Sequence, residues 1–292
     1  MDKITPQTKI LIVGLGLMGG SYARALSRKG YSVRAITPVQ DDIDYAVAGG
    51  FLEQGFTEVT PEILAWPDLI VFALYPHIFT EWIDRYGPLL KPGTLLTDVT
   101  GVKGCVVHKI QDMLPPDVEF IAAHPMAGRE RSGVQHSDDQ VFAGANYIVV
   151  PTERNTEHAI SLCEQLGREL GFFRISRLDV RSHDKMVAFL SQLTHCIAVA
   201  LMCSNDIPGF EAYTGDSFRD LTRIARINDE MWSELFLLNK DALLEEMDLF
   251  MEQFSRMRDM LRNDDKEGLR RMMRLSGERR EKFDKPAAKE NQ

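Results

Sequence analysis

The feature that most constrains the fold is a glycine-rich turn between an apolar run and a helix-like run near the N-terminus. Residues 9–21 read Lys-Ile-Leu-Ile-Val-Gly-Leu-Gly-Leu-Met-Gly-Gly-Ser, so a GxGxxG pattern follows a predicted strand directly and opens a predicted helix. In this context Gly14 permits a tight turn, Gly16 lets the backbone approach a pyrophosphate, and Gly19 allows the helix to pack closely on a sheet. The pattern predicts a dinucleotide-binding α/β unit.

Alternating elements extend this unit over the first half of the chain. Short apolar runs separated by helix-like segments are interpreted as buried parallel strands at residues 10–13, 32–36, 69–74, 94–97, 120–123 and 147–150. Residues 157–170 predict a further helix that stops at Gly171, and residues 172–176 predict a last strand. Strands that alternate with helices predict a doubly wound, Rossmann-like sheet.

The character of the sequence changes after about residue 178, where strand-like runs give way to long helical patterns. Ser182 is expected to cap a helix that runs to about residue 205, and Asn228 or Asp229 to cap another that continues to Leu244. We therefore expect a Rossmann-like domain at residues 1–177, an all-helical domain at 178–284 and a flexible tail at 285–292.

Composition excludes several classes of protein. The net charge of −9 argues against a nucleic-acid partner, because phosphate binding requires clustered Lys and Arg. The four cysteines have neither CxxC nor metal-ligand spacing, which favours a reducing compartment and predicts no metal site. The N-terminus lacks a signal peptide, and the apolar runs are shorter than the roughly 20 residues that cross a bilayer. We expect a cytoplasmic protein without a membrane partner.

The predicted cofactor site lies beyond the ends of several strands. Leu17 and Met18 share the turn with the three glycines already named, and Thr37, Leu74 and Thr100 end or follow other predicted strands. The second strand ends in Ile-Thr-Pro without the acid that usually binds the ribose of NAD. No Arg or Lys that would pair with the additional phosphate of NADP lies there, and the next charges are acidic. The sequence favours NAD and does not exclude NADP.

A histidine follows another predicted strand. Residues 121–133 read Ile-Ala-Ala-His-Pro-Met-Ala-Gly-Arg-Glu-Arg-Ser-Gly, which places His124 at the carboxyl end of a strand. In open α/β sheets ligands bind beyond these ends, so His124 is placed to meet both cofactor and substrate. A base beside a nicotinamide indicates a dehydrogenase.

Four segments together resemble the prephenate/arogenate dehydrogenase family over residues 9 to about 260. They are the histidine segment, Thr-Asp-Val-Thr-Gly-Val-Lys at 97–103, Ser-Gln-Leu-Thr-His at 191–195, and Phe-Arg-Asp-Leu-Thr-Arg-Ile-Ala at 218–225. The resemblance implies an NAD(P)-dependent oxidative decarboxylation in tyrosine biosynthesis. Hydride leaves C4 of prephenate for the nicotinamide, the ring carboxylate leaves as carbon dioxide, and 4-hydroxyphenylpyruvate remains.

The resemblance also implies residue roles. His124 matches the catalytic histidine, which accepts the proton of the C4 hydroxyl. The substrate is a dicarboxylate, and Arg223 matches the carboxylate-binding arginine, with Asp220 orienting the site. The alternative for Arg223 is a surface ion pair with Asp220 three residues earlier.

The helical domain is implied to complete the site and to form a homodimer. His195 matches a histidine that helps to bind substrate, and Ser191 lies on the same helical face four residues earlier. Trp232 matches a tryptophan that reaches the active site from the partner subunit in relatives. Packing within the helical core is the alternative for Trp232.

The chain departs from the family pattern at three positions. Gly101 stands where many relatives have a serine that orients the catalytic histidine, and the adjacent Thr100 is a candidate to supply that hydroxyl. Gln192 and Thr194 replace a histidine and a proline of the common SHLPH segment, so substrate selection is expected to differ. Lys103 is interpreted as a solvated strand end and is left out of the site.

Several functions stay open. An arogenate dehydrogenase differs only in acting on a substrate with an amino group in place of the keto oxygen. A β-hydroxy-acid dehydrogenase of similar domain composition would leave the segment around Arg223 unexplained. Gly101 supports a dinucleotide sensor that has lost the chemistry, but such a sensor needs neither a base nor a carboxylate clamp, and the chain has His124, His195 and Arg223. We expect neither a mutase domain before the first strand nor a regulatory domain after the helices.

Overall fold

The computed structural model describes residues 1–128 and 131–284. The tail expected at residues 285–292 lies outside the described residues, as do Arg129 and Glu130 of the histidine segment. The chain forms two compact units, Met1–Leu243 and Leu244–Gln292. The domain boundary expected at residues 177 and 178 falls inside the first unit and stays a prediction.

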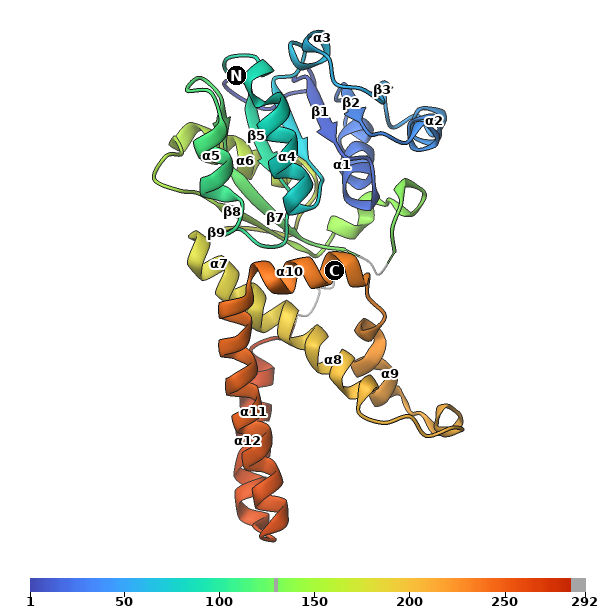
Figure 1. Ribbon diagram of the computed structural model, residues 1–292, viewed down its shortest axis with the longest axis vertical. Helices are drawn as coiled ribbons and strands as arrows, with labels where there is room; N and C mark the ends of the chain where they lie inside the picture. The colour runs from blue at the N-terminus through green and yellow to red at the C-terminus, as the bar shows by residue number, and fades with distance from the viewer. Residues whose placement is uncertain (129–130, 285–292) are drawn as a thin grey trace, which may run out of the picture. The chain divides into compact units, whose positions relative to one another are not determined.

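A parallel six-stranded sheet is the centre of the first unit (Figure 1). Its strands are β1 (Ile10–Val13), β2 (Val33–Ile36), β3 (Gln54–Phe56), β4 (Leu69–Phe72), β5 (Leu95–Asp98) and β6 (Glu119–Phe120). The order β3-β2-β1-β4-β5-β6 confirms the doubly wound prediction, with the switch in direction between β1 and β4. The sequence did not indicate β3, because its three residues, Gln-Gly-Phe, carry one apolar side chain.

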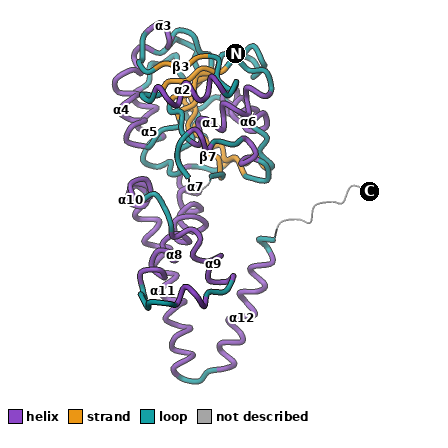
Figure 2. The backbone as a smooth tube through the Cα atoms, turned by 90° about the vertical axis from the view of Figure 1, so that its right-hand side faces the viewer, coloured by secondary structure: helices purple, strands orange, loops and turns teal. Residues whose placement is uncertain are grey.

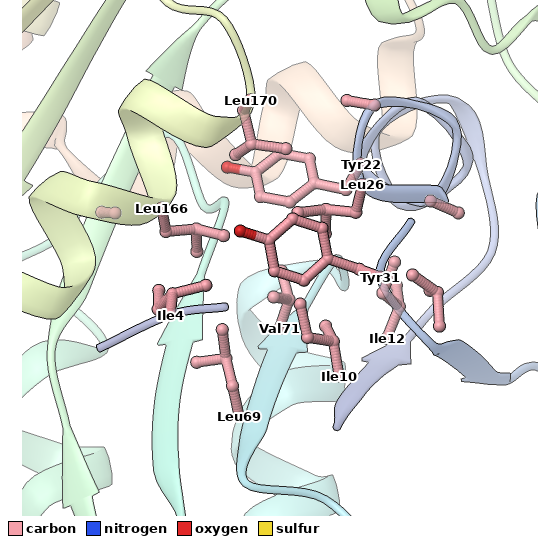
Figure 3. Close-up of a cluster of buried hydrophobic side chains, with 14 of the residues drawn as sticks. Ile4, Ile10, Ile12, Tyr22, Leu26, Tyr31, Leu69, Val71, Leu166 and Leu170 are labelled. Atoms are coloured by element: carbon pink, nitrogen blue, oxygen red, sulfur yellow. The ribbon is translucent and has the colours of Figure 1, made fainter. Parts of the chain in front are cut away.

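Helices cover both faces of this sheet, and β1 shows why. Its four residues are all buried, with Ile10 and Ile12 in one hydrophobic cluster and Leu11 and Val13 in another. Figure 3 shows the first cluster, where side chains of the N-terminal helix and of a helix near residue 166 meet the strands. The helices of this part are α1 (Leu17–Arg28), α2 (Gln40–Ala48), α3 (Pro61–Leu64), α4 (Pro76–Tyr86), α5 (Val107–Met113) and α6 (Glu157–Glu169), with a 3₁₀ turn at Gly87–Leu89.

His124 lies in the middle of a strand of a second sheet and not at the carboxyl end of a strand of the central sheet, which corrects the predicted position of His124 and the prediction of six parallel strands. The strands of the second sheet are β7 (Ala122–Met126), β8 (Asn146–Val150) and β9 (Arg174–Arg177). β7 pairs antiparallel with β8, and β8 pairs parallel with β9. An apolar run indicates that a strand is buried, but it does not indicate whether the strand runs parallel or antiparallel to its neighbour. The antiparallel pairing could therefore not be predicted from the sequence pattern. Two 3₁₀ turns, Val134–His136 and Asp139–Phe142, lie between β7 and β8.

The helical part of the first unit begins at α7 (Val180–Val187), two residues before the predicted cap. Asp179, not Ser182, caps the helix, since its carboxylate accepts a hydrogen bond from the Ser182 amide at 2.9 Å. A π-helical turn at Ala188–Gln192 joins α7 to α8 (Leu193–Cys203), and Figure 1 shows them as one rod. The remaining elements are a 3₁₀ turn at Phe210–Tyr213, α9 (Asp216–Thr222), a 3₁₀ turn at Arg223–Ala225 and α10 (Asp229–Leu238).

Asn228 caps α10 as predicted, but the helix ends at Leu238 and does not continue to Leu244. The interruption lies at Asn239, whose buried side-chain amide donates to the Asp184 carbonyl at 3.0 Å and to Gln192 Oε1 at 2.7 Å. A separate helix, α11 (Lys240–Arg262), follows Asn239 directly. Within the second unit, the rest of α11 and α12 (Lys266–Glu281) form a hairpin (Figure 2).

Candidate active site

The glycine-rich turn has the geometry that a bound pyrophosphate requires. Gly14 has φ +95°, and a Cβ there would overlap the carbonyl oxygen of Ala73. A Cβ on Gly19 would overlap the carbonyl oxygen of Gly14, so α1 packs on the turn at backbone distance. At Gly16 a Cβ would meet nothing within 4 Å, so this residue is not required for packing. Its backbone faces open space where a phosphate can approach.

The N-terminus of α1 is free to bind an anion. Gly16 occupies the N-cap position without a side chain to bond the first amides, and no acidic residue lies in the first turn, which starts with Leu17 and Met18. Unsatisfied amides and the helix dipole favour negative charge at such an end. Leu74 and the residue before Thr37 lie close to this turn. Leu74 would contact a Cβ on Gly14 at 2.9 Å, and the residue before Thr37 accepts the Gly14 amide at 2.8 Å.

A buried ion pair lies at the carboxyl end of β5. Asp98 and Lys103 have no exposed side-chain surface, and Lys103 Nζ lies 2.7 Å from Asp98 Oδ2. The ammonium also donates to the Ala123 carbonyl at 2.6 Å, and Asp98 Oδ1 accepts the Ala123 amide at 3.1 Å. These bonds tie the loop after β5 to the residue before His124. Lys103 is therefore not the solvated strand end that the sequence indicated.

Thr100 belongs to the same network. Its hydroxyl bonds Asp98 and the Val102 carbonyl, and Lys103 Nζ donates to it at 3.1 Å. These partners occupy the hydroxyl, so Thr100 holds the loop and does not replace the serine missing at position 101. A direct contact between Thr100 and a cofactor stays a prediction.

His124 is held by a second histidine that the sequence analysis missed. His124 Nδ1 lies 2.8 Å from His183 Nε2, and His183 Nδ1 lies 2.7 Å from Asp184 Oδ1. The Asp184 carboxylate also accepts the amides of Lys103 and Gly104 at 2.8 and 2.7 Å. Three residues on α7 and β7 thus form a chain from a fixed carboxylate to the predicted base.

Both histidines are electrostatically biased toward the neutral form. Burial lowers the pKa of His124 well below its usual range, and the His183 ring and the Lys103 ammonium lower it further. Burial also lowers the pKa of His183, against the opposing hydrogen bond and charge of Asp184. His124 keeps an accessible edge, whereas the His183 side chain is fully buried. A neutral imidazole at neutral pH can accept a proton.

The free nitrogen of His124 faces Gly101. A Cβ at position 101 would lie 3.9 Å from His124 Nε2 and 3.7 Å from the nearest methyl of Leu235 on α10. These are ordinary van der Waals distances, so a serine would fit here with its hydroxyl close to Nε2. Gly101 provides no such hydroxyl, and the hydrogen bond described for the His124 ring is the contact with His183.

The predicted substrate residues of α8 and α10 meet each other. His195 Nδ1 donates to the Ser191 carbonyl at 2.8 Å, which orients the imidazole along the helix. The ring stacks on Trp232 of the same chain, with centroids 3.8 Å apart. Trp232 therefore reaches His195 without a partner subunit. Ser191 lies in the π-helical turn, a distortion that is frequent at functional sites.

Arg223 and Asp220 lie in the short segments after α8. Asp220 is in α9, Arg223 starts the following 3₁₀ turn, and both are exposed to solvent. Exposure suits residues that meet a charged ligand. Their role as a carboxylate clamp stays a prediction.

Among the described residues no three His, Cys, Asp or Glu side chains are grouped closely enough to hold a metal ion. The four cysteines are free.

Comparison with known families decides the assignment. Residues 22–172 match the prephenate dehydrogenase nucleotide-binding domain, and residues 179–275 match the prephenate dehydrogenase dimerization domain. The chain belongs to the prephenate dehydrogenase family. As a member it is an oxidoreductase of the prephenate/arogenate dehydrogenase class, which confirms the resemblance and the order of a Rossmann-like part followed by a helical part.

Individual relatives agree with this assignment. The chain is 28% identical over 289 residues to the prephenate dehydrogenase of Bacillus subtilis, covering 93% of this chain and 75% of that protein. It is 27% identical to the cyclohexadienyl dehydrogenase of Zymomonas mobilis, covering 88% of this chain and 89% of that protein. The crystal structure of prephenate dehydrogenase from A. aeolicus, in complex with hydroxyphenyl propionate and NAD+, superposes with a TM-score of 0.88 at 26% identity, covering 97% and 100% of the two chains.

Within the described residues, one helical stretch meets the length and composition of a membrane span. Val180–Cys203 has 24 residues, its most apolar 18-residue window has a mean hydropathy of 1.8, and 28% of that window is buried within the chain. This stretch lies in the range that matches the prephenate dehydrogenase dimerization domain. Its apolar surface is accordingly a candidate for contact with a second subunit.

Proposed function

We propose that this protein catalyses the NAD-dependent oxidative decarboxylation of prephenate to 4-hydroxyphenylpyruvate. The observation that carries the proposal is His124. Its ring is biased to the neutral form, its Nε2 lies beside Gly101, and the uncapped N-terminus of α1 after the glycine-rich turn would bind a dinucleotide. The A. aeolicus relative, solved with NAD+ and hydroxyphenyl propionate, supports the same cofactor and a ligand with an aromatic ring and a carboxylate.

The residues present fit NAD. Gly14, Gly16 and Gly19 form the turn around which a pyrophosphate would bind, and Leu17 and Met18 supply amides at the start of α1. The nicotinamide accepts the hydride when bound. The first turn of the neighbouring helix α2 carries Asp41 and Asp42, whose charges disfavour the additional phosphate of NADP.

His124 handles the proton of the reaction. Its Nε2 accepts the proton of the C4 hydroxyl as hydride leaves C4, so a carbonyl forms there. The ring carboxylate then leaves as carbon dioxide, and its bonding electrons aromatise the ring and place negative charge on the C4 oxygen. The imidazolium returns its proton to this phenolate, so His124 ends the cycle neutral. Lys103 and the His183 ring do not favour a lasting positive charge on His124, which supports the return step.

The helical part would bind the acidic side chain of the substrate. Arg223 can pair with a carboxylate in two-pronged geometry, with Asp220 limiting its orientation. His195, held by the Ser191 carbonyl and by Trp232, would border the same ligand. These roles rest on the matched sequence segments and on the exposure of both charged residues.

Arogenate is the second candidate substrate. The relative from Zymomonas mobilis is a cyclohexadienyl dehydrogenase, and it matches this chain nearly as well as the Bacillus subtilis enzyme does. Gln192 and Thr194 differ from the common family segment, but Gln192 is buried and bonds the Leu235 carbonyl, so it supports α10 instead of facing a ligand.

We further infer a cytoplasmic homodimer with the boundary between its domains near residue 178. The free cysteines support a reducing compartment. Large apolar side chains are exposed in the range that matches the dimerization domain, among them Phe189, Met202 and Phe254. A second copy would cover part of this surface.

The test is to incubate the purified protein with prephenate and with arogenate, each with NAD and with NADP, and to follow the absorbance of the reduced cofactor. We expect turnover with prephenate and NAD. Faster turnover with arogenate would establish the second candidate. A protein that binds NAD and turns over neither compound would refute the proposed function.

A further inference from the structure

His183 and Asp184 form a hydrogen-bonded pair behind His124 that the assigned chemistry does not use. His183 is fully buried, and its two ring nitrogens contact Asp184 and His124 at 2.7 and 2.8 Å. Asp184 is in turn held by the amides of Lys103 and Gly104 at 2.8 and 2.7 Å. Each polar atom of the pair therefore has a fixed partner.

The chemistry of these partners determines where the protons lie. An ionised carboxylate can only accept hydrogen bonds, so His183 Nδ1 carries a proton and donates it to Asp184. In a neutral ring the remaining nitrogen, His183 Nε2, then has a lone pair. The contact at 2.8 Å requires a donor opposite this lone pair, so the proton of neutral His124 lies on Nδ1.

We propose that His183, fixed by Asp184, is a positioning residue that keeps the proton of His124 on Nδ1 and leaves Nε2 free to accept the proton of the substrate. The proposal rests on the proposed role of His124 as the base. The free Nε2 is the atom that faces Gly101, on the ring edge opposite the His183 contact.

The surroundings of His124 in this chain leave the orienting role to the pair of His183 and Asp184. Position 101 carries no side chain that could orient His124 from the Nε2 side, and the Thr100 hydroxyl is occupied by Asp98, Val102 and Lys103. The His124 ring is instead oriented from its Nδ1 side by His183. Asp184 also connects the loop after β5 to α7, so the base is aligned with the same loop that ends the central sheet.

The first test is ¹⁵N NMR of the full-length protein with labelled histidine side chains, at a pH where the rings are neutral. The chain has seven histidines, and the His124 signals are those that disappear in His124→Asn. We expect a protonated Nδ1 and an unprotonated Nε2. A wild-type His124 with its proton on Nε2 would overturn the proposal without further variants.

Two substitutions of His183 extend the test. His183→Phe removes the acceptor, so the His124 proton is expected to move to Nε2, the preferred site in free imidazole. We expect kcat to fall at least about tenfold, as for other residues that orient a histidine, with the Kd of NAD unchanged. His183→Gln keeps an amide oxygen that can accept from Nδ1, and we expect it to recover part of the kcat and the wild-type tautomer.

The matched control is His108→Phe, because His108 is exposed on α5 and is not part of the site. It should leave both kcat and the His124 tautomer unchanged. If His183→Phe does not fold, the proposal is tested by the ¹⁵N spectrum of the wild type and by the kcat and His124 tautomer of His183→Gln. Wild-type kcat and tautomer in a folded His183→Phe would overturn the positioning role and leave the proposed function intact. The expected tautomers in a protein that turns over no substrate would refute the function and leave the positioning role intact.

Discussion

The charge of Lys103 is fully removed from solvent. Its ammonium is surrounded by Asp98, Thr100 and the Ala123 carbonyl, and neither partner of the ion pair is exposed. Such a pair is costly to bury but more costly to break, because the remaining charge loses its counter-ion in a medium of low dielectric constant.

Lys103→Met should therefore destabilise the fold strongly. We expect the free energy of unfolding to fall by about 3–5 kcal/mol, since the substitution leaves Asp98 buried without its counter-ion. Urea unfolding measures the change. Lys91→Met is the matched control, because Lys91 pairs with Asp68 at 3.2 Å near the surface and should lose less than about 1 kcal/mol. Equal losses in the two variants would contradict this account of the buried pair.

His124→Asn should separate chemistry from binding. A positioned general base contributes about 10²–10⁴-fold, so we expect kcat to fall by that factor, while the Kd of NAD, measured by calorimetry, changes little. The glycine-rich turn is untouched by this substitution. A variant that retains wild-type turnover would show that His124 is not the base.

Part of this site could be predicted from the sequence. Gly14, Gly16, Gly19 and His124 lie in local motifs whose spacing carries the chemistry. His183 could not be found in this way, because it acts through a contact across 59 residues of chain, and its own neighbourhood looks like an ordinary helix start. The adjacent His-Asp pair at the beginning of a helix was the available clue.

The turn between β1 and α1 shows that similar glycines can have different functions. Gly19 lies against the backbone of Gly14, whereas Gly16 has open space around its missing side chain. The first is required for packing of an element, and the second for access of a ligand.

Substitution by alanine should distinguish these functions. Gly19→Ala is expected to displace α1 and to lower the melting temperature together with NAD affinity. Gly16→Ala is expected to fold with nearly wild-type stability and to lose NAD affinity, because its methyl group would occupy the approach of the pyrophosphate. Thermal unfolding and calorimetric titration of both variants measure the difference. Unchanged NAD affinity in Gly16→Ala would exclude close approach of the cofactor at this turn.

At the scale of elements, the sequence predicted helices and buried strands better than their pairing. The apolar runs at β7 and β8 indicated burial correctly, but their antiparallel pairing depends on contacts that no local pattern encodes. The end of α10 was missed for a similar reason. Asn239 interrupts an apolar repeat because its side chain satisfies Asp184 and Gln192, which precede it by 55 and 47 residues.

The whole molecule should lose stability in mild acid through its buried histidines. His124 and His183 have pKa values below their ordinary value in the folded state, because burial disfavours their charged forms. Below pH about 6.5 the unfolded chain therefore binds more protons than the folded one, and the free energy of unfolding falls as pH decreases. The nearby charges of Lys103, Asp98 and Asp184 belong to the same buried network.

Urea unfolding at pH 7.5 and pH 5 should show this loss, and His124→Asn should show a smaller loss because asparagine does not titrate. His108→Gln, at an exposed position on α5, is the control and should behave as the wild type does. An identical pH dependence in His124→Asn and the wild type would contradict the contribution of His124.

The assembly is expected to be a dimer. Light scattering after size exclusion should give twice the chain mass of 33.1 kDa. Phe189, which is 50% exposed in the π-helical turn, is a candidate contact residue, and Phe189→Glu should weaken the dimer because it would bury a charge. A wild-type protein that stays monomeric at micromolar concentration would contradict the assignment of this surface.

The stack of Trp232 on His195 also provides an optical reporter. The chain has three tryptophans. Trp82 is a buried residue of α4, and Trp66 lies under the Arg34 guanidinium. An imidazole in stacking contact quenches indole emission, so a ligand that separates the His195 and Trp232 rings should brighten one fluorophore and leave the other two unchanged. The light emitted by the unlabelled protein would then record the arrival of substrate before any hydride moves.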